Sequence, residues 1–132
     1  MGENLRLKRA LAITAAHDSV IGISTHGNNS VVPSNGCHIG KFAGVVVLKP
    51  SADTTVTTED HKDSLEKLAC DLSKHVIGMN PVALHPGSQS GVAPEESLMG
   101  QEFLLDDKVV VGDLLTKRGV EVVDFIRFGL SS

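Results

Sequence analysis

The sequence has no tryptophan and no tyrosine, and only four of its 132 residues are phenylalanine. A hydrophobic core must therefore be built mainly from Val, Leu, Ile and Ala, and neither an aromatic cage nor a base-stacking platform is expected. Long apolar runs are also missing, since none approaches the roughly 20 residues that a membrane-spanning helix needs. The composition predicts a soluble protein with no membrane partner.

Positive charge is scarce as well. The formal net charge is −4 and the sequence pI is about 5.8, whereas nonspecific binding to nucleic acid needs clustered Lys and Arg that neutralise several phosphates. The one basic cluster, Arg6, Lys8 and Arg9, is short. We therefore expect no direct nucleic-acid partner.

The length of 132 residues, with 41% hydrophobic and 21% charged residues, fits a single domain over residues 1–132. The strongest periodic segment is Glu59 to Pro81, which predicts an amphipathic helix over Asp60–Asn80. Lys74 and His75 are expected at the negative end of its dipole, and Gly78 and Pro81 are expected to end it. Its apolar stripe comprises Leu65, Leu68, Ala69, Leu72, Val76 and Met79.

Alternating or continuous apolar residues predict strands on both sides of this helix. The run Phe42–Leu48 is continuous and should be the central strand, because a strand buried on both faces reads this way. A loop over Val82–Ser97 and a short helix over Val109–Arg118, ended by Gly119, are also expected. The fold class is α+β, a three- to four-stranded mainly antiparallel sheet with helices packed on one face. The other predicted strands are Leu5–Thr14, Ser19–Thr25 and Val120–Phe128.

Two cysteines, Cys37 and Cys70, occur in a sequence without a signal peptide, which favours free thiols in a reducing compartment, although one disulfide stays possible. A metal site that combines Cys70 and His75 is disfavoured, because five helical positions turn the two side chains about 140° apart. No serine sits in a nucleophile elbow, so no catalytic residue is expected. Neither a metal nor another cofactor is expected. His26, between an apolar strand and a polar loop, remains the best functional candidate, with a turn histidine bonded to local backbone as its alternative.

Four blocks of the sequence resemble the elongation factor Ts family. GENLRLKRALAI is similar to the family's G-E-N strand entry, and GISTHG at Gly22–Gly27 is similar to G-S-Y-x-H-G. GKFAGVVVL with LACDLSKHVIGMNP resembles the strand R-I-G-V-L-V and the helix I-A-M-H-V-A-A-x-x-P. GQEFLLDDKVVVGDLLTKRGVEVVDFIRF resembles G-Q-P-F-V-x-D-P-x-x-T-V-G-Q-L-L-K-E-x-x-A-E-V-x-x-F-I-R-F. The lengthened loop over Asn28–His38, GMNP and VVDFIRF are closest to mitochondrial members.

This resemblance implies the C-terminal core subdomain of a factor that exchanges guanine nucleotides on elongation factor Tu, and not an enzyme that makes or breaks bonds. It also implies a location in the mitochondrial matrix, although the chain shows no presequence. The family's N-terminal helical module and its Thr-Asp-Phe-Val stretch, which contacts the magnesium side of the partner's nucleotide pocket, have no counterpart in the 132 residues. We therefore expect a fragment that binds the partner but has weak exchange activity of its own.

The family's interface histidine corresponds to His26, so the resemblance implies partner binding by His26 with its neighbours Ser24, Thr25 and Gly27. Two alternatives stay open. One is a module that binds the same partner without promoting exchange. The other is a small α+β enzyme or metal-binding domain that uses His26, His38 and Cys37, which would require these side chains to converge in a pocket.

Overall fold

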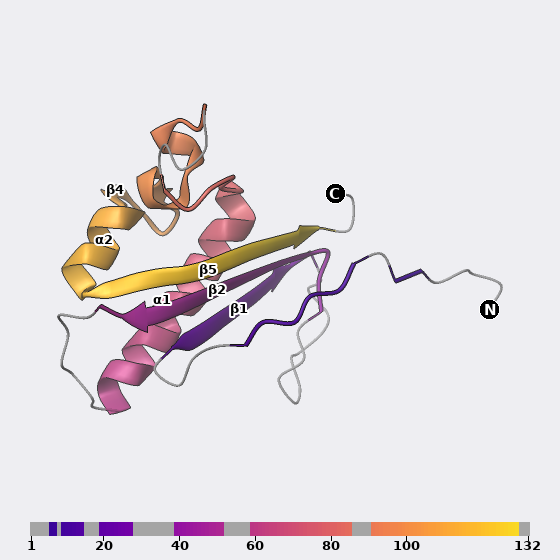
Figure 1. Cartoon of the computed structure of the whole chain (residues 1–132), viewed down its shortest axis with the longest axis horizontal. Helices are drawn as coiled ribbons and strands as arrows, with labels where there is room; N and C mark the ends of the chain where they lie inside the picture. The colour runs from indigo at the N-terminus through magenta and orange to yellow at the C-terminus, as the bar shows by residue number, and fades with distance from the viewer. Residues whose placement is uncertain are drawn as a thin grey trace.

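A computed structural model of the chain describes residues 6–7, 9–14, 19–27, 39–51, 59–85 and 91–129, and the structural statements below concern these residues. A three-stranded antiparallel sheet and a long helix form the body of the molecule, and a small hairpin and a second helix adjoin them (Figure 1). In chain order the elements are β1 (Val20–His26), β2 (Phe42–Pro50), α1 (Glu59–Met79), the 3-10 turns η1 (Pro94–Glu96) and η2 (Leu98–Gly100), β3 (Glu102–Phe103), β4 (Asp106–Val110), α2 (Val111–Arg118) and β5 (Val120–Gly129).

The sheet has the strand order β1-β2-β5, so the apolar strand β2 is central as predicted. Its register pairs Ile23 with Val45 on one side and Val45 with Ile126 on the other. The α+β class and the antiparallel sheet are confirmed. Strands β3 and β4 are not part of this sheet. They form a separate two-stranded hairpin that the sequence analysis did not predict.

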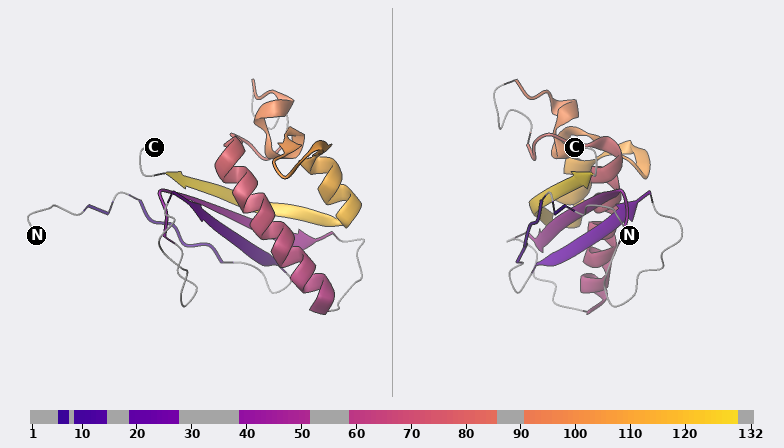
Figure 2. Two further views of the ribbon diagram at one scale, coloured as in Figure 1. Left: turned by 180° about the vertical axis from the view of Figure 1, so that it is seen from behind. Right: turned by 90° about the vertical axis from the view of Figure 1, so that its right-hand side faces the viewer.

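Helix α1 lies across one face of the sheet (Figure 2). Its predicted stripe is buried from Leu65 to Val76, and Leu72 and Val76 are fully inaccessible. Glycines at the crossing allow this close approach, because a Cβ on Gly22 would overlap the backbone of Ala69, and one on Gly44 would overlap the Ser73 carbonyl. The core between sheet and helices also includes Val46, Leu48, Leu98, Phe103, Val111, Leu115 and Val120.

The predicted strand over Leu5–Thr14 is wrong for the part that the structure describes, since residues 6–7 and 9–14 form no strand. Residues 9–14 pass on the side of the sheet away from α1 (Figure 2). Arg9, which interrupts the apolar alternation, donates from Nη2 to the Gly129 carbonyl at 3.0 Å and lies over the Phe128 ring. Leu7 and Leu11 are exposed, so this segment attaches through an arginine rather than through a ladder of backbone hydrogen bonds.

The C-terminal end of α1 also differs from the prediction. Met79 is 41% exposed and leaves the buried stripe. Gly78 lies inside the helix, which ends because Asn80 adopts a positive φ of 46° before Pro81. His75 is fully buried rather than exposed at the dipole's negative end.

The second helix ends as predicted, with Gly119 in the left-handed region at φ 65° and its N–H bonded to the Leu115 and Thr116 carbonyls. It starts at Val111 rather than Val109, because Asp106–Val110 forms strand β4. The expected loop over Val82–Ser97 contains η1 and a bridge between Ala83 and Ser97. None of the helices in the described residues has the length and apolar character needed to span a membrane.

Candidate functional site

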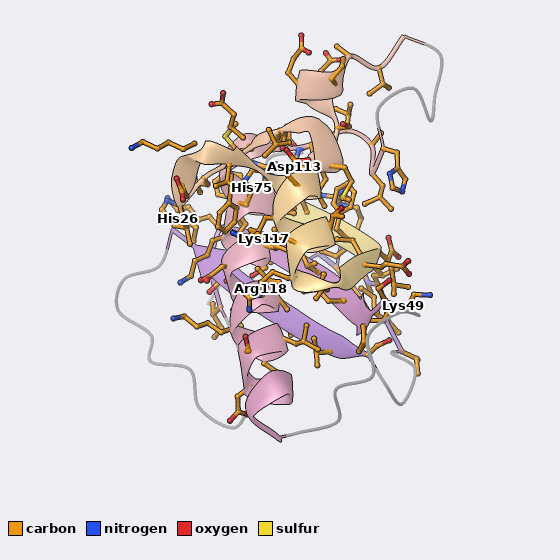
Figure 3. The ribbon with its side chains drawn as sticks, turned by 90° about the vertical axis from the view of Figure 1, so that its left-hand side faces the viewer. His26, Lys49, His75, Asp113, Lys117 and Arg118 are labelled. Atoms are coloured by element: carbon orange, nitrogen blue, oxygen red, sulfur yellow. The ribbon has the colours of Figure 1, made fainter. Side chains whose placement is uncertain are left out.

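His26 is the last residue of β1, and its side chain is exposed. Its backbone is fixed on both sides: it pairs with Phe42 in the sheet, and its carbonyl accepts the Lys41 N–H at 2.8 Å. The next residue, Gly27, has φ +94°, a conformation that other L-residues rarely adopt. Strand and turn therefore hold His26 in place by its main chain and leave the imidazole available. Figure 3 shows His26 and Lys49 on opposite sides of the molecule.

The four residues implied by the resemblance do not share one environment. Thr25 is half-buried, and Thr25 and His26 both line a groove. Ser24 is only 8% exposed and faces α1, where its hydroxyl lies 2.7 Å from the Ser73 hydroxyl and 3.2 Å from the Cys70 carbonyl. The Ser24 side chain thus joins the strand to the helix, while Gly27 contributes a backbone conformation.

The groove beside His26 has a volume of about 550 Å³ and is formed by residues that are distant in the sequence. Leu104 and Leu105, at the turn between β3 and β4, are 47% and 56% exposed. The Arg127 guanidinium lies 4.9 Å from the centre of the Phe42 ring, and its Nε donates to the Ile77 carbonyl at 3.2 Å. The lining comprises Thr25, His26, Phe42, Lys74, Ile77, Gly78, Leu104, Leu105 and Arg127.

The groove is apolar with a positive rim. Lys74 and Arg127 are the charged residues in its described lining, and no carboxylate contributes to it. Gly78 lets the hairpin turn approach α1, because an added Cβ would lie 3.1 Å from Leu104 Cδ2. Such a surface suits an apolar side chain of another protein with an acidic neighbour. Of the residues that line the groove, only His26 and Thr25 were predicted for the site. The wall formed by Leu104 and Leu105 was missed, and its signal in the sequence is the pair of consecutive leucines in FLLDD.

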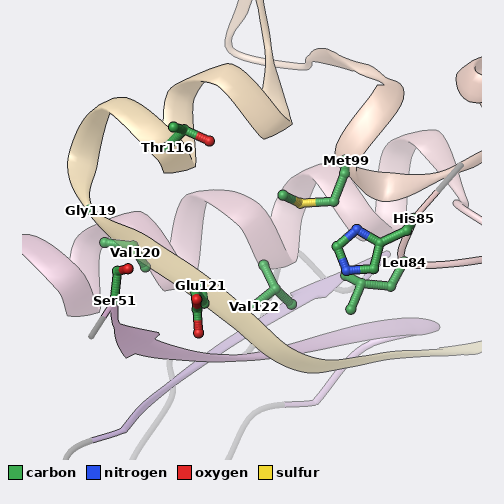
Figure 4. Close-up of a pocket in the computed structure, with 9 residues that line it drawn as sticks. All are labelled: Ser51, Leu84, His85, Met99, Thr116, Gly119, Val120, Glu121 and Val122. Atoms are coloured by element: carbon green, nitrogen blue, oxygen red, sulfur yellow. The ribbon is translucent and has the colours of Figure 1, made fainter. Parts of the chain in front are cut away.

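A second cavity, of about 570 Å³, lies between the start of β5 and the segment around Leu84 (Figure 4). Leu84, Met99 and Val122 give it an apolar part, and His85 and Glu121 give it polar groups. None of the residues predicted for the site lines this cavity. We therefore place the candidate site at the groove beside His26.

An enzyme or metal site would need His26, His38 and Cys37 to converge. Positions 37 and 38 lie outside the described residues. Within the part of the chain that is described, no group of three His, Cys, Asp or Glu side chains could hold a metal ion. Cys70 is a free, half-buried thiol. Nothing in the described geometry supports the enzyme or metal-binding alternative.

No family model matches the chain. Proteins named mitochondrial elongation factor Ts match most of it: one from Nematostella vectensis is 38% identical over 97% of the chain, one from Xenopus laevis 34% and one from Homo sapiens 30% over the same share. The chain spans about two fifths of these relatives, 43%, 40% and 37% of their lengths. Their names support the predicted mitochondrial location. The resemblance to elongation factor Ts is confirmed, and across 97% of its residues the chain is homologous to the mitochondrial proteins of that family.

Proposed function

We propose that the chain binds mitochondrial elongation factor Tu through the groove beside His26 and takes part in exchanging GDP for GTP on that protein, in the mitochondrial matrix. The observation that carries the proposal is an exposed histidine, at the position implied by the family resemblance, beside an apolar groove with a positive rim. Such a factor needs no nucleophile, no general base and no cofactor of its own. Direct contact with nucleic acid is not part of the proposal.

The groove is suited to a protein surface. Leu104 and Leu105 expose about half of their side chains, and a partner's side chain that covered them would bury this apolar area. Arg127 is oriented by its bond to the Ile77 carbonyl and by the Phe42 ring, so little side-chain entropy would be lost on binding. Interface energy concentrates in a few such anchored residues.

Exchange follows from binding by linkage. A factor that binds the nucleotide-free partner more tightly than the loaded one weakens nucleotide binding by the same ratio. Contacts of equal strength in both states shift nothing. Because the 132 residues contain no Thr-Asp-Phe-Val stretch, we predict that this chain by itself binds elongation factor Tu but releases its GDP slowly. A fluorescent GDP release assay beside the binding titration measures the two properties separately.

His26→Ala tests the binding site. We expect the affinity for mitochondrial elongation factor Tu to fall by about 2 kcal/mol, roughly thirtyfold, as for a residue at the centre of an interface. The melting temperature should stay nearly unchanged, because the hydrogen bond between His26 and Lys41 is made by the His26 backbone and not by its imidazole. Calorimetric titration and thermal unfolding measure the two effects.

His85→Ala is the matched control, since His85 is also an exposed histidine but lines the second cavity and not the groove. It should leave the affinity within about twofold, since a residue outside an interface contributes little to binding. Equal losses in both variants would argue against the groove as the binding site. A large loss of stability in His26→Ala would instead favour a structural turn histidine.

A further inference from the structure

His75 lies on α1 beneath the wall of the groove, and none of its surface is exposed. Its Nδ1 lies 3.0 Å from the backbone nitrogen of Leu104, and its Nε2 lies 2.9 Å from Oε1 of Gln101. The imidazole also stacks on Phe103, with ring centres 5.9 Å apart and an angle of 27° between the planes. One side chain of the long helix thus contacts three residues at the start of the hairpin, Gln101, Phe103 and Leu104.

These contacts define the protonation state of the ring. A backbone N–H can only donate, so Nδ1 must accept the Leu104 N–H and carry no proton. Nε2 then carries the proton and donates a hydrogen bond to Gln101 Oε1. The amide nitrogen of Gln101 is left to donate to the Met79 carbonyl at 3.4 Å, near the end of α1. All three bonds are satisfied together only when His75 is neutral.

We propose that His75 is a positioning residue for the partner-binding groove, holding the backbone of Leu104 so that the side chains of Leu104 and Leu105 form the wall opposite His26. This inference rests on the proposed function for its effect on binding. The contact between His75 and Leu104 stands independently of it, because it is a property of the free chain.

A residue that merely filled the core would not need a hydrogen-bond acceptor facing the Leu104 N–H. The Leu104 N–H is partly buried, and removing Nδ1 would leave it without a protein partner. Leu104 already exposes 47% of its surface, so apolar burial holds this turn only in part. The hydrogen bond from the Leu104 N–H to α1 therefore helps to fix the position of the turn, together with the buried ring of Phe103.

The same geometry makes the wall sensitive to acid. Burial lowers the pKa of His75 from its ordinary value of 6.5, and the bond to Gln101 opposes this shift in part. Among the described residues, the groups that hydrogen-bond to the ring or stack on it are Gln101, the Leu104 backbone and Phe103, none of which ionises. On α1 itself, neighbouring Lys74 is exposed and Asp71, one turn earlier, is half-buried, and neither contributes to the shift. Protonation of Nδ1 would remove the acceptor and release Leu104.

Acid should also lower the stability of the folded chain. Because the folded-state pKa lies below the unfolded value, the unfolded chain binds the proton first as the pH falls. The stability contributed by neutral His75 is complete above about pH 6.5 and is lost progressively as the pH falls below that value toward the folded-state pKa. Groove binding should weaken at still lower pH, near and below the folded-state pKa, where the folded chain itself takes up the proton.

Hydrogen exchange of the Leu104 amide in the free chain tests the positioning contact directly. His75→Asn keeps an acceptor oxygen near the position of Nδ1 and cannot be protonated, whereas His75→Ala removes the acceptor. We expect slow exchange in the wild type and His75→Asn, and exchange at least about tenfold faster in His75→Ala, as the loss of one such hydrogen bond implies. Equal exchange rates in the wild type and both variants would overturn the inference.

Binding to mitochondrial elongation factor Tu, measured by calorimetry from neutral pH down to the lowest pH at which the chain stays folded, supplies the second readout. His75→Ala should weaken binding about tenfold at neutral pH and His75→Asn about twofold or less, because only the latter restores the acceptor. His75→Asn should also have a flatter acid profile than the wild type, because its side chain cannot be protonated. Equal acid profiles, or equal losses in both variants, would refute positioning by His75.

The two proposals can fail separately. If wild-type chain binds no elongation factor Tu at any pH, the proposed function falls, and the exchange rate of the Leu104 amide still decides whether His75 holds the turn. If His75→Ala does not fold, His75→Asn and the wild-type acid profile suffice, since a merely structural role predicts no difference between their acid profiles.

Discussion

Gly22→Ala is expected to destabilise the chain by about 3 kcal/mol or more, at or above the upper end of the range for overpacked cores. A Cβ at this position would overlap the Ala69 carbonyl and lie 2.5 Å from the Cys70 nitrogen. Both groups belong to the backbone of α1, so no side-chain rotation can relieve the overlap, and the whole helix must move off the sheet. Urea unfolding would measure the loss.

Ile23→Val is the control for this substitution. Ile23 is the next residue of β1, points away from α1 and is 38% exposed. Loss of one methylene there should cost only about 0.5 to 1.5 kcal/mol. If Gly22→Ala were no more destabilising than this control, α1 would not cross β1 as closely as described.

Leu72→Ala is the second substitution with a large expected effect. Leu72 is fully buried at the middle of the α1 stripe, in the core between α1 and the sheet. Its truncation should cost about 2 to 5 kcal/mol, the sum of lost burial and of the cavity left behind. Thermal or urea unfolding would detect the loss as an earlier transition.

Leu105→Ala provides a matched comparison, because Leu105 is 56% exposed and lines the groove. It should change the stability by less than about 0.5 kcal/mol, as is usual for surface substitutions. It should nevertheless weaken binding to elongation factor Tu. An unchanged melting temperature in Leu72→Ala would contradict the packing of α1 on the sheet.

Local periodicity predicted the parts of this fold that depend on local patterns. The stripe from Leu65 to Val76 predicted α1, because a helix buried on one face has apolar residues at helical spacing. The uninterrupted apolar run in β2 predicted the central strand, because a strand buried on both faces has no polar alternation. Gly119 ended α2 for an equally local reason, its positive φ.

Errors arose where a distant contact overrides the local pattern. The alternation around Arg9 suggested a strand, but Arg9 binds the end of β5 instead. His75 looked like a dipole-complementing cation, yet the hairpin that buries it follows more than twenty residues later. The β3–β4 hairpin is too short for a periodic signal, with two and five residues in its strands.

The candidate site was predictable only in part for the same reason. Resemblance located His26, and its position at a strand end explains its exposure. The opposite wall, Leu104 and Leu105, comes from a turn about eighty residues away, and no spacing rule brings it to β1. Ser24 could not be recognised as a strand-to-helix contact without the position of Ser73.

The most direct measurement is the methyl spectrum of isotope-labelled chain during titration with unlabelled, nucleotide-free mitochondrial elongation factor Tu. We predict saturable changes at the methyl groups of Ile77, Leu104 and Leu105, which line the groove, with little change at Leu84 and Val122 in the second cavity. Changes confined to Leu84 and Val122, or no change at saturating partner, would contradict this prediction.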